Sequence, residues 1–330
     1  MRGVSRQAEA AAFPPDRFYC LLDELPLHLI PRPARQALHR REKDSPTLFL
    51  NSDCVITSGE LLPGELAHSA DLFSGFALQG TIVWVRSSST GSLLPFWLGR
   101  KFATLLQSLH PNEPVPATFP AEARELLLAA GILVPESSLA SIPSAPAQIS
   151  QSAAMFRERR YAPLRDLIHP FHIAALCRYY RHLIRTGAIQ LGDRQSPRRY
   201  VAYNEPVARF FHHQITASLS VLAGEPLKPS YVYLASYLSG AELKKHTDRE
   251  QCEFSITLCL DFSPEPALAT PWPIHLDTPR GSVTVYQALG DALAYRGTSL
   301  PHYRHALSEG HTSTSIFFHY VSADFEGALE

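Results

Sequence analysis

The triplet His246-Thr247-Asp248, in the last third of the chain, contains residue types that bind metal ions. Alternate residues on a β-strand point to the same face, so His246 and Asp248 can reach a single ion. One further histidine would complete a set of two imidazoles and one carboxylate. Such a set covers one face of an octahedral metal and leaves three positions open. Because the chain has 15 histidines, the spacing alone is weak evidence, and the neighbouring sequence decides.

The sequence on both sides of the triplet predicts β-strands. Residues 230–237 are rich in β-branched and aromatic types, and Gly240 marks a turn before the triplet. Between residues 252 and 260 apolar and polar residues alternate, which is typical of a half-buried strand. Short strands separated by turn residues continue to the end of the chain and indicate a sandwich or barrel; they are expected at 281–286, 292–295 and 313–321.

Residues from about 200 to 325 resemble the double-stranded β-helix, or jelly-roll, core of the 2-oxoglutarate- and Fe(II)-dependent oxygenases. The nearest branch is the one that contains prolyl hydroxylases, and within it a group of bacterial oxygenases of unassigned substrate. The resemblance covers somewhat more than a third of the chain. It depends on several pieces together: Tyr237 nine residues before His246, the triplet, Gly-Asp-Ala-Leu-Ala-Tyr at 290–295, Pro301-His302, and Phe-Phe-His-Tyr-Val at 317–321.

The resemblance implies a role for four residues. His246, Asp248 and His302 would bind Fe(II), and the phenol of Tyr237 would contact the cosubstrate 2-oxoglutarate. His302 is favoured over His305 as the distal ligand, because His305 would leave too short a loop before the final strand.

The remaining histidines receive structural interpretations. His319 lies within an aromatic strand and is expected to pack there, while His275 is interpreted as structural, with the substrate pocket as its alternative. His212 and His213 fall in a helical segment and are expected to be a solvated pair or to pack a helix.

The residue that pairs with the distal carboxylate of 2-oxoglutarate has two candidates. The family places a basic residue nine or ten positions after the distal ligand, where this chain has His311 and Thr312. His311 could act as a donor or cation, although an imidazole with a pKa of about 6.5 is a weaker anchor than a guanidinium. Arg304 offers the planar fork that suits a carboxylate, at a position beside the ligand histidine.

The activity implied by the resemblance is that of a dioxygenase that hydroxylates an unactivated C–H bond. It would use O2 and convert 2-oxoglutarate to succinate, with ascorbate as a supporting reductant. The expected substrate is an amino-acid side chain, free or within a peptide or protein. The alternative is a catalytically degenerate jelly-roll protein that binds metal or acts as a sensor, and it is motivated by the absence of Arg or Lys at positions 311 and 312.

The composition is that of a globular chain with balanced charge. Its 330 residues carry a net charge of −1, which gives no support for nucleic-acid binding; a homodimer is the expected protein partner. No apolar run approaches a membrane span and no signal-like stretch precedes Phe18, so a cytoplasmic location is expected. A disulfide framework or zinc site is not expected, because the five cysteines are scattered and none forms a CxxC pair: Cys20, Cys54, Cys177, Cys252 and Cys259.

The expected fold class is mainly β with helices (α+β). Residues 136–153 are rich in Ser, Ala and Pro and are interpreted as a linker. After it, 154–330 would form the oxygenase domain, with bracing helices at 170–186 and at 204–223, the second capped by Asn204.

Residues 1–135 are expected to form a smaller N-terminal α/β accessory domain. A strand is predicted at 80–86, and helices at 96–109 and 120–131. This order faintly resembles the winged-helix-like peptide-binding domains found beside enzymes that modify ribosomal peptides. An accessory domain that covers the oxygenase or makes a dimer contact is the alternative.

An arginine cluster at 157, 159, 160 and 165, with Arg198-Arg199 further on, has two interpretations. Guanidinium groups could receive an acidic group of a substrate. The other interpretation is a solvated, charged face.

Overall fold

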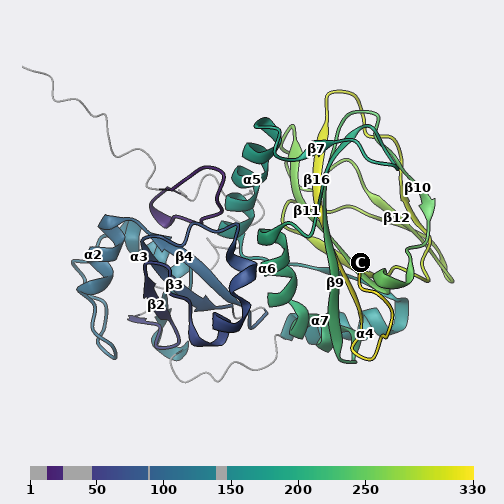
Figure 1. The fold of residues 1–330 in the computed structure, drawn as a ribbon. Helices are drawn as coiled ribbons and strands as arrows, with labels where there is room; N and C mark the ends of the chain where they lie inside the picture. The colour runs from purple at the N-terminus through teal and green to yellow at the C-terminus, as the bar shows by residue number, and fades with distance from the viewer. Residues whose placement is uncertain (1–12, 25–46, 88–89, 139–146) are drawn as a thin grey trace, which may run out of the picture.

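The computed structural model of the protein describes residues 13–24, 47–87, 90–138 and 147–330. A smaller N-terminal unit lies beside a larger β-barrel unit, and helices of the barrel unit lie between them (Figure 1). These helices are α5 (Pro170–Arg185), α6 (Pro206–Gln214) and α7 (Thr216–Ala223). No helix in the described ranges is both long and apolar enough to cross a membrane.

The barrel consists of two facing sheets. The larger one has the order β6 (Tyr161–Leu164), β14 (Ala292–Arg296), β11 (Phe254–Ser263), β16 (Thr312–Ser322), β9 (Leu227–Tyr237), β8 (Arg199–Tyr203) and β7 (Gln190–Leu191). The smaller one has the order β10 (Leu243–His246), β15 (His302–Arg304), β12 (Ile274–Thr278) and β13 (Gly281–Val285). From β9 to β16 the chain moves repeatedly between the two sheets, and all pairs are antiparallel. Eight such strands in two sheets form a jelly roll, as the sequence predicted.

Strand β11 is buried on both faces, which corrects the prediction of a half-buried strand. Nearly all of its residues are buried, including polar Ser255 and Thr257. One face, which carries Ile256, packs in the main hydrophobic core, and the other lines the barrel interior. The sequence alternation is therefore real, but its polar face points into the barrel rather than to solvent.

The bracing helices agree with the sequence except at one boundary. Helix α5 occupies the expected range, whereas the second expected helix is two helices, α6 and α7, that meet at Ile215. The N-cap is Glu205 rather than Asn204: its carboxylate accepts the backbone N–H groups of Val207 and Ala208. Asn204 instead has a φ of 48° and accepts the N–H of Val232, so it joins the helix entry to β9.

In its described residues, the N-terminal unit contains a three-stranded antiparallel sheet and two α-helices. The strands are β2 (Val55–Ser58), β3 (Thr81–Arg86) and β4 (Leu93–Leu98); the helices are α2 (Arg100–Gln107) and α3 (Ala121–Ala129); and β1 (Leu48–Leu50) pairs with β5 (Leu133–Pro135). The helix predicted at 96–109 begins only at Arg100, because the apolar run before it is a fully buried strand. A winged-helix-like, peptide-binding role for this unit stays a prediction.

The two units share one hydrophobic core. Phe18 lies 5.9 Å from Phe211 between ring centroids, and Phe76 lies 5.1 Å from Phe210. Helix α4 (Ala147–Arg159) begins inside the segment expected to be a linker, and residues 139–146 of that segment lie outside the described residues. The division of the chain into domains at 136–153 stays a prediction.

A buried histidine lies where the two units meet. The ring of His172, on α5, packs 4.7 Å from Phe96, and its Nε2 donates to the carbonyl of Pro95 at 2.9 Å. Burial lowers the pKa of His172 to about 3, so the side chain is neutral in the folded protein. Its Nδ1 has no hydrogen-bond partner.

We expect acid to destabilise the protein through His172. Below a pH of about 6.5 the unfolded chain binds a proton at His172 that the folded chain does not bind. The free energy of unfolding therefore decreases as the pH is lowered. The contribution of one such histidine approaches about 1.4 kcal/mol per pH unit below pH ~6. His172→Gln, which can still donate to Pro95, should flatten the curve measured by urea unfolding at several pH values. The exposed His110→Gln is the control, and equal slopes for wild type and His172→Gln would contradict the prediction.

Candidate metal centre

The three predicted metal ligands converge in the barrel. Antiparallel pairing of β10 with β15 places His246 opposite His302, and Asp248 follows two residues after His246. Asp248 Oδ1 lies 3.6 Å from His246 Nε2 and 3.5 Å from His302 Nε2. One donor atom from each residue lies within 4.8 Å of the other two, so the three residues could hold a single metal ion.

Both imidazoles are oriented to present Nε2 to an ion. His246 Nδ1 lies 2.7 Å from the carbonyl of Lys244, and His302 Nδ1 lies 3.0 Å from that of Leu300. A carbonyl can only accept, so Nδ1 carries the proton and the lone pair of the neutral ring is on Nε2. Metal-binding histidines are commonly held by such backbone contacts. The donor set therefore fits a divalent ion with nitrogen and oxygen ligands.

Asp248 is held by a hydrogen-bond chain that sequence reasoning missed. The Ser255 hydroxyl donates to Asp248 Oδ2 at 2.8 Å, and it lies 2.9 Å from His319 Nδ1, from which it accepts. Burial lowers the pKa of His319 to about 4, so this ring is neutral. His319 does pack in its strand as predicted, yet it also positions a metal ligand. The alternation along β11 was the available signal, because it places Ser255 on the inner face.

The electrostatics around Asp248 keep it ionised. Burial raises the pKa of Asp248, but the neighbouring His246 and His302 outweigh this effect and hold the pKa well below its usual range. Conversely, the contact with Asp248 raises the pKa of His246.

Gly297 makes room for the carboxylate. A Cβ at Gly297 would lie 2.3 Å from Asp248 Oδ2, and the Gly297 carbonyl accepts the Asp248 N–H at 2.9 Å. Tyr295, two residues earlier and buried, places its hydroxyl 3.4 Å from His302 Nε2. The run Gly290–Tyr295 thus contributes to the centre as well as to the fold.

Arg304 points into the barrel beside the centre. It lies two residues after His302 on β15 and is only 5% exposed. Its guanidinium donates to the Trp272 carbonyl and to Gln287 Oε1, and it lies 4.8 Å from the centroid of the Trp272 ring. Among the described residues no carboxylate lies within ion-pair distance of it. Burial lowers the pKa of Arg304, as expected for a cation without a carboxylate partner.

Tyr237 lies between two buried arginines. Its ring packs 5.1 Å from Trp272, and burial raises the pKa of its phenol, while the charges of Arg199 and Arg304 oppose this. Arg199, on β8, was assigned from the sequence to an arginine-rich segment but is only 3% exposed. Asp193 neutralises it through contacts of 2.5 and 3.2 Å, and Asp193 also accepts from Tyr233 at 2.9 Å.

The other histidines considered in the sequence analysis lie outside the candidate metal centre. His311 is half-buried in the turn before β16, with its Nδ1 3.0 Å from the carbonyl of Glu309. His275 and His305 contact Tyr303 through ring stacking at 4.9 Å and an edge contact at 5.4 Å. His212 is buried and donates to the carbonyl of His319 at 2.8 Å, so it packs its helix onto β16.

Comparisons with known proteins give structural neighbours only. No family model matches the chain, and no curated protein matches it significantly. Solved structures with a similar fold include the non-heme alpha-ketoglutarate-dependent epimerase SnoN from nogalamycin biosynthesis (16% identity, 54% of this chain and 84% of that chain, TM-score 0.46). A second is a Pseudomonas putida prolyl-4-hydroxylase (15% identity, 53% of this chain and 99% of that chain, TM-score 0.43). A third is HygX from Streptomyces hygroscopicus with nickel, 2-oxoglutarate and hygromycin B bound (12% identity, 53% of this chain and 88% of that chain, TM-score 0.42).

At such identities, and with TM-scores below 0.5, the neighbours carry no argument about the reaction of this chain. The functional case therefore depends on its own metal centre.

We expect Ser255→Ala to weaken metal binding. The substitution removes the donor to Asp248 Oδ2 and leaves His319 Nδ1 without its acceptor. Loss of such an outer contact typically lowers metal affinity by about 10–100-fold. Mn(II) binding, followed by electron paramagnetic resonance, measures the change.

The matched control is Ser315→Ala on the neighbouring strand β16, since no described hydrogen bond joins Ser315 to a metal ligand. Equal Mn(II) affinities for Ser255→Ala and the wild type would show that the hydroxyl does not position Asp248.

Proposed function

We propose that the protein is an Fe(II)- and 2-oxoglutarate-dependent dioxygenase that hydroxylates an unactivated C–H bond. One observation carries the proposal: two imidazole nitrogens and a carboxylate oxygen lie around one ion position. Arg304, two residues after the distal ligand, supports it, because this buried cation has no ion pair with any described carboxylate. Three protein ligands leave positions open for other ligands on an octahedral metal.

The residues of the chain have distinct tasks in this proposal. His246, Asp248 and His302 would hold the metal, and Ser255 keeps the Asp248 carboxylate in place. Iron with bound 2-oxoglutarate supplies the oxidising chemistry; the protein supplies orientation and excludes water. The buried side of the centre, at His302 and Tyr295, excludes solvent, whereas His246 is partly exposed.

Arg304 is the proposed anchor for the distal carboxylate of 2-oxoglutarate. A buried cation without a carboxylate partner is unfavourable, and a bound dicarboxylate would supply the missing negative charge. Tyr237 and Arg304 both pack against the Trp272 ring, at 5.1 Å and 4.8 Å from its centroid, so both can contact the same ligand. Arg199 is a poorer anchor because Asp193 already neutralises it, and His311 lies in a half-exposed turn.

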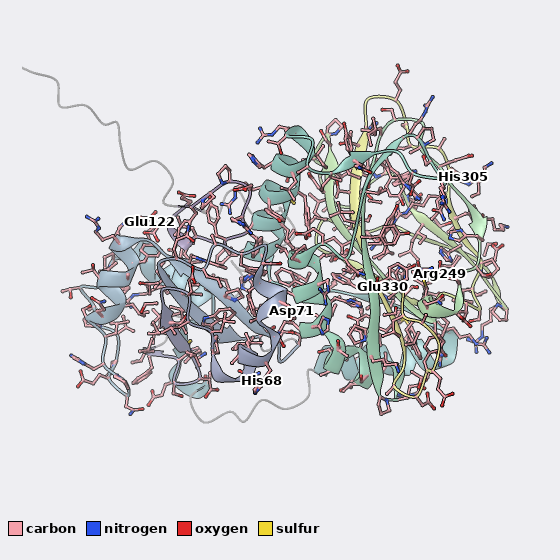
Figure 2. The ribbon with its side chains drawn as sticks, viewed as in Figure 1. His68, Asp71, Glu122, Arg249, His305 and Glu330 are labelled. Carbon is pink, nitrogen blue, oxygen red and sulfur yellow. The ribbon has the colours of Figure 1, made fainter. Side chains whose placement is uncertain are left out.

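The proposed substrate is an amino-acid side chain, free or in a peptide or protein. A row of aromatic rings leads from the centre to the surface and supports a ligand with an apolar body. His319 lies 4.6 Å from Tyr231, and Tyr231 lies 5.8 Å from Tyr203, which is 61% exposed. Arg249, marked in Figure 2, covers the Tyr231 ring at 4.6 Å and could pair with a carboxylate of the substrate.

The alternative is a degenerate protein that binds metal without turnover, and the reason for considering it is weakened. It was suggested by the absence of a basic residue at positions 311 and 312, and Arg304 provides a buried guanidinium in the barrel instead. Four further points stay predictions: ascorbate as a supporting reductant, a homodimer, the absence of nucleic-acid binding, and a cytoplasmic location.

An anaerobic titration tests the site. Addition of 2-oxoglutarate to the Fe(II)-loaded protein should produce the weak visible charge-transfer band of the chelate. Asp248→Ala should abolish the band, because a metal ligand is lost. A wild-type protein that binds iron but gives no band would contradict the proposed function.

Arg304 should select for the distal carboxylate. We expect wild type to bind 2-oxoglutarate more tightly than 2-oxovalerate, which has the same chain length but no distal carboxylate. Arg304→Gln should remove most of this preference, a loss of at least about tenfold, or 1.4 kcal/mol. Arg304→Lys, which keeps the charge, should retain part of it, and His311→Ala should change nothing. An unchanged preference in Arg304→Gln, with a loss in His311→Ala, would assign the anchor to His311.

Turnover separates an enzyme from a binding protein. We expect slow conversion of 2-oxoglutarate to succinate without added substrate, dependent on Asp248 and O2. Complete absence of succinate, with an intact charge-transfer band, would favour the binding protein.

A further inference from the structure

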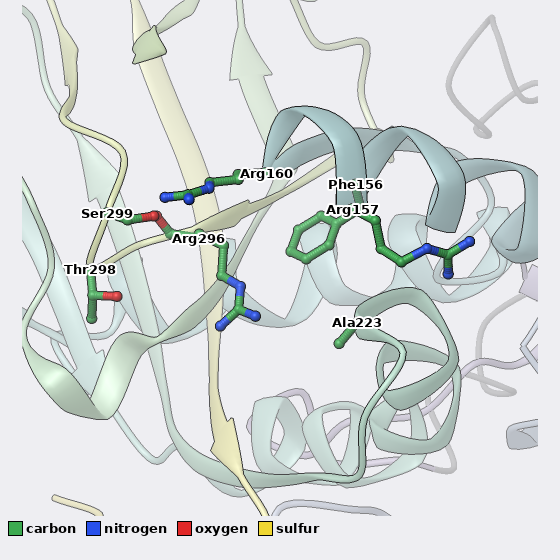
Figure 3. Close-up of a pocket in the computed structure, with 7 residues that line it drawn as sticks. All are labelled: Phe156, Arg157, Arg160, Ala223, Arg296, Thr298 and Ser299. Carbon is green, nitrogen blue, oxygen red and sulfur yellow. The ribbon is translucent and has the colours of Figure 1, made fainter. Parts of the chain in front are cut away.

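A second cavity lies outside the metal centre. It has a volume of about 380 Å³, which falls within the range of small-molecule sites, about 300–1,000 Å³. Helix α4, the end of β14 and the following loop form it, with Phe156 and Ala223 as apolar parts (Figure 3). Its polar lining consists of three arginines and two hydroxyl residues: Arg157, Arg160, Arg296, Thr298 and Ser299.

The cavity has uncompensated positive charge. None of its lining residues is acidic. Arg296 is held by Glu253 at 2.5 Å and Glu225 at 3.1 Å. By contrast, none of the described carboxylates forms an ion pair with Arg157 or Arg160.

The fold pairs the backbones of two of these arginines. The N–H of Arg296 donates to the carbonyl of Arg160 at 2.9 Å, one residue beyond the antiparallel pair Tyr161 and Tyr295. In addition, Arg160 has a φ of 64°, a left-handed conformation that costs a non-glycine residue about 1–2 kcal/mol. An anion bound at Arg160 would give this side chain the partner that none of the described carboxylates provides.

The helix dipole of α4 explains the position of only one of the three arginines. Basic residues in the last turn of a helix interact favourably with its dipole, which accounts for Arg157 on α4. Arg160 lies beyond the end of the helix, and Arg296 comes from β14, so the dipole accounts for neither.

We propose that this cavity binds a phosphate group. Guanidinium forks and hydroxyl donors are the groups that recognise phosphate oxygens, and Arg157 and Arg160 have no carboxylate to satisfy them. Two lining residues of the cavity, Arg296 and Thr298, flank Gly297, whose carbonyl accepts the N–H of Asp248. Free phosphate and the phosphate ester of a larger molecule share this chemistry.

Titration calorimetry on the full chain, treated with a chelator so that phosphate cannot bind iron, tests the proposal. It does not depend on the oxygenase function, since no metal takes part. We expect saturable binding of inorganic phosphate or of phenyl phosphate. Arg160→Gln and Arg157→Gln should each weaken it by about tenfold or more. Arg160→Lys should retain part of the affinity, because it keeps the charge.

The matched control is Arg185→Gln, since Arg185 is also an exposed arginine in the last turn of a helix. Binding that survives in both cavity variants, or that falls equally in Arg185→Gln, would overturn the proposal, as would the absence of saturation in wild type. Tighter binding of phenyl phosphate than of phosphate would identify an ester as the ligand; the reverse order would identify the free ion. Thermal melting of each variant confirms that it folds.

Discussion

The pairing of β10 with β15 is the interaction on which the centre depends. It places His246 directly opposite His302, although 56 residues separate them in the sequence. Asp248 follows just beyond the end of β10, where its N–H donates to the Gly297 carbonyl. Within β15, Arg304 follows His302 by two positions, so both side chains lie on the same face. A slip of one residue in this register would turn the ligands to the other face of the sheet, so the barrel must fix the register before the site exists.

The larger sheet of the barrel supports the centre, and its strand β11 is buried on both faces. The outer face packs on the helices and on the N-terminal unit, which share one apolar core with it. The inner face is polar along β11, and its Ser255 can be buried because Asp248 and His319 satisfy its hydroxyl. A buried polar group without partners would be costly, so this chain of hydrogen bonds makes the ligand position and the fold interdependent.

The arginines of the protein differ in whether a carboxylate pairs with them. Arg199 and Arg296 have carboxylate partners and are structural cations. Arg304, inside the barrel, and Arg157 and Arg160, around the second cavity, have no ion-pair partner among the described residues. Anionic ligands are expected where the fold leaves cations without partners, and the two places differ in burial and therefore in the ligands that can reach them.

The sequence by itself predicted the three candidate metal ligands and determined the strand pattern, because both are local: a His-x-Asp spacing, a Pro-His pair before a final strand, and alternation of period two. It could not choose between Arg304 and His311, since the answer depends on which of them points into the barrel. It also misjudged Arg199, which is buried by contact with Asp193. Only the tertiary structure brought Ser255 and His319 to Asp248, and Arg160 to Arg296, because these contacts depend on strand register and on charges from distant segments.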